Sequence, residues 1–319
     1  MPPARRIAVD AMGGDHAPSA IVDGAVSAAR ELGIGVALVG ATPLIEQALG
    51  AHAGWRDLGL EIVEAPEVIG MEEPPAASLR RKPGASIRVA AGMVADGRAD
   101  ALFSAGNTGA AVMAAHAAFG MIRGVDRPAL GAVVPTRERP AVLLDVGANA
   151  ECRPQHLVHF AFMGGMYARL ALGVERPRIG LLSIGEEATK GNELTREAHR
   201  LLAASPIDFV GNVEARDLYR GLADVIVCDG FTGNVVLKVS EGLIETVEAV
   251  LGHELQGAFD YSEYGGAPLL GVGGLTVVGH GRSSPKAVRN AIAMADRFAR
   301  FDFIRRVEQE IAAAHVSPR

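Results

Sequence analysis

The chain has 319 residues, of which 49% are hydrophobic and 21% charged, a composition typical of a globular protein large enough to bury a core without disulfides. Its net charge of −6 argues against a nucleic-acid-binding protein, because a phosphate backbone requires a basic surface. The two cysteines, Cys152 and Cys228, are too few for a disulfide framework or for a multi-cysteine metal or iron–sulfur site.

The apolar segments are too short for a membrane span or a signal peptide. The longest weakly polar stretch, residues 267–279, falls short of the ~20 residues that cross a bilayer, and its glycines disfavour a helix. The first residues lead directly into a short apolar run that lacks the length of a signal-peptide core. The sequence therefore predicts a cytoplasmic protein.

Short β-branched runs alternate with longer Ala- and Leu-rich stretches along the chain. The runs predict strands at residues 7–10, 36–39, 60–63, 101–104, 142–145, 179–183, 209–211 and 225–228. Helical periodicity is present at residues 20–32, 86–95, 109–119, 156–172 and 194–202, and a further helix is expected to start near Val235. This order predicts an α/β fold with a doubly wound, mostly parallel sheet, forming one two-lobed domain over residues 1–319.

Six of the predicted strands are followed by polar loops that contain glycine or amide residues. These loops span residues 11–16, 105–109, 146–151, 185–193, 212–217 and 229–234. The carboxyl ends of parallel strands share one edge of a sheet, and turns that begin helices there offer free N–H groups to an anion. For any one loop, ordinary capping and turn formation is the favoured interpretation. Six such loops together indicate an anion-binding site.

Several familiar motifs are absent from these loops. No strand is followed by a G-x-G-x-x-G dinucleotide motif, and no G-x-S-x-G serine motif occurs. The segment 185–192 differs from a P-loop because its lysine precedes a glycine instead of following one. No histidine pair has the spacing and acidic neighbours of a metal site. The sequence therefore predicts neither a cofactor nor a metal.

Lysine is rare among the 31 basic residues, and its four positions are Lys82, Lys190, Lys238 and Lys286. A basic residue at an unconstrained position of this chain is therefore usually arginine. Lys190 lies inside a polar loop, and its compact ammonium suits a phosphate. Lys238 is better interpreted as a solvated helical residue.

The loops also carry the motifs of a known family. In chain order these are VDAMGGDHAP at 9–18, SAGNTGA at 104–110, DRPAL at 126–130, DVGAN at 145–149, KGNEL at 190–194, GNVEARD at 211–217, DGFTGNV at 229–235 and YSEYGGA at 261–267. With these motifs the sequence resembles, over nearly its whole length, the bacterial phosphate acyltransferases, which are fatty acid and phospholipid synthesis proteins.

The resemblance implies reversible transfer of a fatty acyl group from acyl carrier protein to inorganic phosphate. It also implies a fold similar to the isopropylmalate dehydrogenase and phosphotransacetylase group, a homodimer, and delivery of the acyl phosphate to a membrane glycerol-3-phosphate acyltransferase. The residues suit this chemistry, because phosphate is already a nucleophile and the leaving thiol has a pKa of about 8.5. Holding the anion and stabilising the oxyanion then suffices, without a covalent nucleophile.

The resemblance and this chemistry give the loop residues their expected roles. Lys190 with Asn192 is expected to neutralise and orient phosphate, and His16 or His280 to protonate the thiolate. Hydrogen bonds to phosphate or to the oxyanion are expected from Asn107, Thr108, Thr232 and Asn234. Carboxylates repel phosphate, so an orienting role is expected for Asp10, Asp15, Asp145, Glu214 and Asp229.

Acyl carrier protein is acidic, so its docking surface should be basic. The favoured candidate is the group Arg80, Arg81, Lys82 and Arg88, and the alternative is Arg297, Arg300, Arg305 and Arg306 on the C-terminal helix. Residues 235–275 are expected to make the dimer contact and to face the membrane or a partner. Because residues 246–260 are short and mildly acidic, we expect weak direct membrane contact, with peripheral association through the partner.

Two other functions remain open from the sequence. The protein could be a non-catalytic scaffold that binds acyl carrier protein and recruits a membrane acyltransferase, although the polar loops would then have no role. It could also be an NAD-dependent decarboxylating dehydrogenase of related fold, although no aspartate cluster for a metal and no cofactor pocket is visible in the sequence. Phosphate-dependent turnover and a nicotinamide absorbance change distinguish these alternatives.

Overall fold

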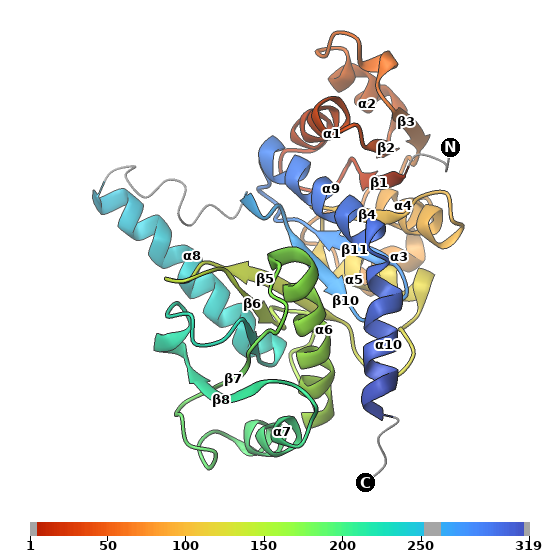
Figure 1. Ribbon diagram of the computed structural model, residues 1–319. Coiled ribbons are helices and arrows are strands. Elements are labelled where there is room, and N and C mark those ends of the chain that lie inside the picture. The colour runs from red at the N-terminus through yellow and green to blue at the C-terminus, as the bar shows by residue number, and fades with distance from the viewer. Residues whose placement is uncertain (1–4, 252–262, 316–319) are drawn as a thin grey trace. The chain divides into compact units, whose positions relative to one another are not determined.

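The computed structural model describes residues 5–251 and 263–315, which fold into two compact units (Figure 1). One unit comprises Met1–Gly120 and Tyr261–Asp302, and the other comprises Met121–Asp260 and Phe303–Arg319. The chain passes between the units after residues 120, 260 and 302. Neither unit is therefore a continuous stretch of sequence, which explains why no linker is visible in the composition.

The first unit has a mostly parallel sheet. Its strands, in spatial order, are β3 (Leu60–Glu64), β2 (Gly35–Gly40), β1 (Arg6–Asp10), β4 (Ala101–Ser104), β11 (Leu275–Val278) and β10 (Ala267–Leu270). Neighbours pair in parallel except β10 and β11, which form an antiparallel hairpin. Its helices are α1 (Ser19–Leu32), α2 (Thr42–Leu49), α3 (Pro75–Arg81), α4 (Ser86–Ala95), α5 (Thr108–Phe119) and α9 (Pro285–Arg300).

Helices cover both faces of this sheet, and strand β1 shows how. Alternate residues of a strand point to opposite faces. Ile7 and Val9 pack in the core cluster that includes side chains of α1 and α9. Ala8 is equally buried but lies outside that cluster, and α4 packs against β1. Burial on both faces is why the strand is a continuous apolar run.

The second unit has a sheet with strand order β5 (Ala129–Val134), β6 (Ala141–Leu144), β9 (Val225–Val227), β7 (Ile179–Ser183) and β8 (Phe209–Glu214). All pairs are parallel except β5 with β6. Its helices are α6 (Pro154–Leu172), α7 (Glu193–Ala203), α8 (Gly230–Leu251) and α10 (Phe303–His315). Helix α6 packs against β6 and β9 and also contacts α7 and α10.

The predicted fold class is confirmed. Every predicted strand is present, and so is every helix for which a residue range was predicted. Helix α8 begins at Gly230 instead of near Val235, because the Asp229 side chain caps it there. The hairpin β10–β11 in the stretch 267–279 was not predicted, because glycines interrupt the apolar run there. Strand β5 and helices α2 and α3 were not predicted either. The arginines expected on one C-terminal helix lie on two, since Asp302 between α9 and α10 has a φ of 53°.

Two adjacent glycines of α6 should respond oppositely to alanine. A Cβ at Gly164 would lie 2.5 Å from Val225 Cγ1, whereas a Cβ at Gly165 would meet nothing closer than 3.6 Å. Gly164→Ala should destabilise the protein by about 1–3 kcal/mol through overpacking. Gly165→Ala should be neutral or stabilising, since alanine is favoured in a helix by about 1 kcal/mol. Thermal unfolding of both variants tests this contrast, and equal effects would contradict it.

Candidate functional site

In the first unit, Asp10 ends strand β1 and is 3% exposed. The hydroxyl of Ser104, at the end of β4, donates to Asp10 Oδ2 at 2.7 Å, and the Met12 N–H donates to Oδ1 at 3.3 Å. Burial raises the pKa of Asp10, and these hydrogen bonds oppose that rise. Asp10 therefore fastens the start of loop 11–16 to the neighbouring strand, an arrangement that suits an orienting role.

The loops after β1, β4 and β11 approach one another through glycine. A Cβ at Gly13 would lie 2.7 Å from both Asp10 Oδ2 and the Gly106 backbone nitrogen, so no larger residue fits. The Asp15 N–H donates to the Gly281 carbonyl at 2.8 Å. The Asp15 side chain itself is on the exposed surface of the loop. The first unit thus brings loops 11–16, 105–109 and 279–284 into one backbone-lined cluster, which we call the glycine cluster.

Asn107 is engaged by the protein itself. Its Oδ1 accepts the Ala110 N–H at 3.0 Å and so caps helix α5. Its Nδ2 donates to the carbonyls of Gly70, Met71 and Glu73 at 3.3, 2.9 and 3.0 Å. Thr108, the first residue of α5, is exposed, and its hydroxyl bonds to no residue that the structure describes. At this helix start, Thr108 is the predicted donor that remains available.

The two candidate histidines differ in surroundings. His16 is exposed and its ring bonds to no residue within 5–251 or 263–315. His280 is half-buried, and its Nδ1 accepts the Arg282 N–H at 3.1 Å. Both belong to the glycine cluster, His16 in the loop after β1 and His280 in the loop after β11.

Lys82 and Glu73 form an ion pair that the sequence did not reveal. Lys82 Nζ donates to Glu73 Oε1 and to the Val68 carbonyl, each at 2.6 Å. The lysine, the Gly70 N–H and the Ser78 hydroxyl together hold the pKa of Glu73 down to about 2. Of the four residues expected to dock the carrier protein, Arg80, Arg81 and Arg88 are exposed, whereas the charge of Lys82 is neutralised by Glu73.

In the second unit, Asp145 follows β6 and is fully buried. Its carboxylate accepts the backbone N–H groups of Leu130, Gly147, Ala148 and Asn149 and the side-chain amide of Asn149, at 2.8–3.1 Å. Burial raises its pKa and the donors oppose the rise. The carboxylate therefore shapes loop 146–151, as an orienting residue would.

The start of α8 lies against this loop. Asp229 accepts the Thr232 N–H at 2.9 Å and the Thr232 hydroxyl at 2.8 Å. Asn234 Nδ2 donates to the Val146 carbonyl at 3.2 Å. A Cβ at Gly233 would lie 1.9 Å from the Asp145 carbonyl oxygen, so glycine is required there. The hydroxyl proton of Thr232 is thus already donated within the protein.

Lys190 stands near the start of α7 and is exposed. Its ammonium makes no hydrogen bond or ion pair with any residue that the structure describes. Asn192 Oδ1 accepts the Thr195 N–H at 2.9 Å and caps α7, while the Asn192 amide nitrogen bonds to no described residue. Glu214, at the end of β8, pairs with Arg216 at 2.7 Å. An unpaired ammonium and a free amide at a helix start are groups whose charge and hydrogens suit an anion.

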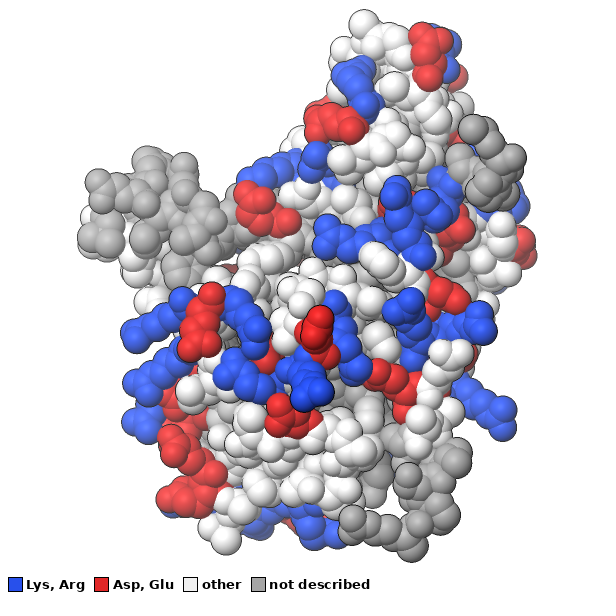
Figure 2. Space-filling view, viewed as in Figure 1, with Lys and Arg blue, Asp and Glu red and all other residues white. Residues whose placement is uncertain are grey.

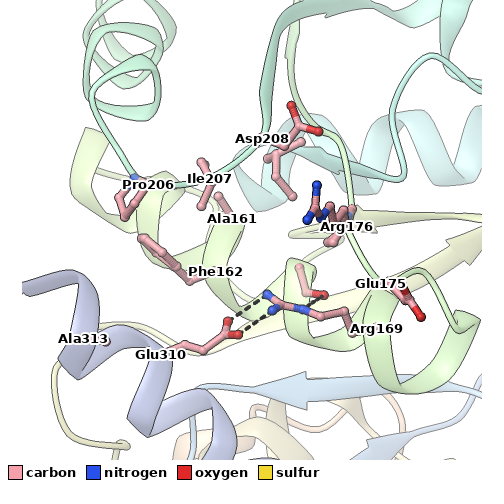
Figure 3. Close-up of a pocket in the computed structure, with 13 residues that line it drawn as sticks. Ala161, Phe162, Arg169, Glu175, Arg176, Pro206, Ile207, Asp208, Glu310 and Ala313 are labelled. Atoms are coloured by element: carbon pink, nitrogen blue, oxygen red, sulfur yellow. Dashed lines mark hydrogen bonds and ion pairs between the residues drawn. The ribbon is translucent and has the colours of Figure 1, made fainter.

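A cavity of about 630 Å³ lies away from these loops (Figure 3). It lies at the amino ends of β7 and β8, where Pro177 and Asp208 line it, beside the ion pair of Arg169 with Glu310 at 2.5 and 2.9 Å. None of the predicted site residues lines it. Within residues 5–251 and 263–315, no group of three His, Cys, Asp or Glu is placed to hold a metal.

Comparisons with known proteins identify the same family as the motifs of these loops. Residues 5–259 and 253–306 match the family described as Fatty acid synthesis protein. The chain is 49% identical to the phosphate acyltransferase of Desulforudis audaxviator, with 94% of each chain covered. It is 48% identical to that of Heliobacterium modesticaldum, covering 96% of this chain and 97% of the relative.

A solved structure gives the same fold. The phosphotransacetylase from Streptococcus pyogenes superposes with a TM-score of 0.67 at 18% identity, covering 94% of this chain and 95% of that chain. At such low identity the likeness concerns the fold alone, and it supports the predicted α/β architecture.

Sequence analysis missed two elements of these sites. It did not single out Glu73, and it did not assign Asn149, whose amide binds both Asp145 and the Pro128 carbonyl at 2.6 Å. The Glu72-Glu73-Pro74-Pro75 run could have indicated a turn before a helix, because proline is favoured at a first helical position. Nothing in the sequence indicates that Lys82 closes that turn.

The low pKa of Glu73 predicts a pH-dependent contribution to stability. The folded value of about 2 lies below the ordinary 4.5, so the ionised carboxylate stabilises the fold above about pH 4.5, and this contribution disappears as pH falls toward 2. We expect the stability difference between the wild type and Glu73→Gln to shrink over that window in urea unfolding. A difference independent of pH would contradict this cause.

Replacing an acceptor oxygen of Asp145 should destabilise the protein strongly. Asp145→Asn would turn an NH₂ group toward buried N–H donors and should cost at least about 2 kcal/mol of unfolding free energy. Asp229→Asn is the matched control, since asparagine caps a helix about as well as aspartate and should change stability by less than about 0.5 kcal/mol. Chemical denaturation measures both, and equal losses would refute the distinction.

Proposed function

The chain belongs to the fatty acid synthesis protein family and is an acyltransferase, and on that premise we propose that it transfers a fatty acyl group from acyl carrier protein to inorganic phosphate. The observation that carries the proposal is the high identity, over nearly the full chain, to proteins named phosphate acyltransferase. In the reaction a phosphate oxygen attacks the thioester carbonyl, a C–O bond replaces the C–S bond, and the carrier thiol leaves with a proton. The product is an acyl phosphate.

The cysteines support direct transfer to phosphate. Burial, with the nearby charge of Asp145, raises the pKa of Cys152 to about 12. The same causes raise the pKa of the fully buried Cys228 well above its ordinary value. A thiol acts as a nucleophile through its thiolate, so both cysteines are poor acyl acceptors at neutral pH. Phosphate itself is then the acceptor that attacks the thioester.

Positive charge for phosphate comes from Lys190. Its ammonium is free of protein partners among the described residues, and the N-terminus of α7 adds backbone N–H groups two residues away. Asn192 contributes the free hydrogens of its amide. In the first unit, Thr108 offers a hydroxyl at the start of α5. These groups are the proposed donors to phosphate and to the oxyanion, and His16 or His280 is the proposed acid for the thiolate.

The carrier protein is proposed to dock on exposed arginines. Arg80, Arg81 and Arg88 remain from the predicted group once Lys82 is paired with Glu73. Figure 2 shows basic side chains interspersed with acidic ones. Because the protein is acidic overall, the proposed docking surface is a local group of arginines and not a broad basic face. An acidic partner is steered by such a concentrated positive charge.

Helix α8 supports the proposal of a homodimer. Its exposed apolar side chains recur every four residues and so share one helical face, and they are Phe231, Val235, Val239 and Leu243. We propose that a second copy of the chain covers this face. Residues 252–262 of the segment assigned to this contact lie outside the described residues.

Delivery of the product to a membrane glycerol-3-phosphate acyltransferase is proposed to occur through contact with that partner. Among residues 5–251 and 263–315, no helix has both the length and the apolarity to cross a bilayer. The cytoplasmic location stays a prediction. The weak direct membrane contact is also a prediction, which vesicle co-sedimentation of the purified protein tests.

Removing the Lys190 charge should weaken phosphate binding. Lys190→Ala should raise the KM for phosphate about 10- to 100-fold, the effect of losing a charge-assisted hydrogen bond. The assay is phosphate-dependent release of carrier thiol from palmitoyl-acyl carrier protein, with the acyl phosphate trapped by hydroxylamine.

Lys238→Ala is the control, because Lys238 already pairs with Glu241 at 2.7 Å on the surface of α8. An unchanged KM for phosphate in Lys190→Ala would refute the role of Lys190. Absence of phosphate-dependent release by the wild type would refute the proposed function.

A further inference from the structure

The turn Gly70–Glu73 is held by an unusually dense set of polar contacts. Asn107 Nδ2 donates to three of its carbonyls, and the Glu73 N–H donates to the Gly70 carbonyl at 3.1 Å. The Glu73 carboxylate accepts the Gly70 N–H at 3.0 Å, the Ser78 hydroxyl at 2.7 Å and the Lys82 ammonium at 2.6 Å. These bonds fix the turn against the start of α5.

Burial of the turn does not explain why so many hydrogen bonds hold it. Met71 is 43% exposed, and Glu72 is exposed as well. Ordering an exposed turn costs about 1–2 kcal/mol of conformational entropy per residue and gains little from the hydrophobic effect. What the network achieves is a fixed backbone position for Met71, from which its side chain extends.

That position is over the glycine cluster. A Cβ at Gly281 would lie 2.9 Å from Met71 Cε and 3.2 Å from Asp15 Oδ2, so the methionine tip rests directly on the loop after β11. Met71 therefore places an apolar surface beside backbone loops and beside the α5 N-terminus with its available Thr108. An anionic head with an apolar tail matches this combination.

We propose that Met71 contacts the acyl chain of the substrate, and that Asn107 is the positioning residue that holds Met71 in place. This inference rests on the proposed function, because the apolar tail it assigns is the fatty acyl group. An unbranched, polarisable thioether adapts to a flexible saturated chain better than a branched side chain does. Met71 is then a residue that favours long acyl chains over short ones.

The test is the ratio of kcat/KM for palmitoyl- over butyryl-acyl carrier protein. A four-carbon chain offers little surface to the methionine, so Met71→Ala should lower the ratio about fivefold by removing apolar contact from the long chain only. The KM for phosphate should not change. Met113→Ala is the matched control, since Met113 is 41% exposed on α5 and should leave the ratio at the wild-type value.

A second variant separates positioning from phosphate binding. Asn107→Asp keeps the oxygen that caps α5 but cannot donate to the three carbonyls, so it should lower the chain-length ratio as Met71→Ala does. If Asn107 instead bound phosphate, the new negative charge would raise the KM for phosphate and leave the ratio unchanged.

An unchanged ratio in Met71→Ala, or an equal fall in Met113→Ala, would overturn the role of Met71 while leaving the proposed function intact. If the wild-type protein shows no phosphate-dependent transfer, both the role of Met71 and the proposed function are wrong.

Discussion

Each unit depends on a buried aspartate at the carboxyl end of a parallel strand. Asp10 and Asp145 are both at most 3% exposed; Asp10 accepts one N–H group from the loop that follows it, and Asp145 accepts three. A buried carboxylate without donors would be strongly unfavourable, so the loops must bend back to supply them. This requirement makes the loops compact and brings their backbone N–H groups together at the edge of each sheet.

Glycine allows the loops around these aspartates to approach one another closely. At Gly13 and Gly233 a Cβ would collide with the backbone of a neighbouring loop or with an aspartate that organises it. Close approach of backbones exposes peptide dipoles instead of side chains, which suits an anion such as phosphate. The motif residues therefore fall into two groups, those that build the loops and those that remain free to bind.

Asn107 and Lys190 illustrate the division. Both were assigned to the anion from the sequence, where an amide and an ammonium in polar loops look equivalent. In the structure Asn107 is engaged by three carbonyls and one N–H, whereas Lys190 is unpaired among the described residues. A family of acyltransferases needs both kinds of residue, because a donor is useful only if the loop that carries it is rigid.

The sequence by itself determined most of the strands and helices and the polar loops, because a strand buried on both faces must be apolar and a loop that bends around a carboxylate needs glycine. It could not determine which polar groups are already paired. Ser104 meets Asp10 across 94 residues of sequence. Lys82 and Lys190 are the same residue type in comparably polar segments, yet only one is neutralised by a carboxylate. Such pairings depend on distances of a few ångströms between segments, and only the tertiary structure decides them.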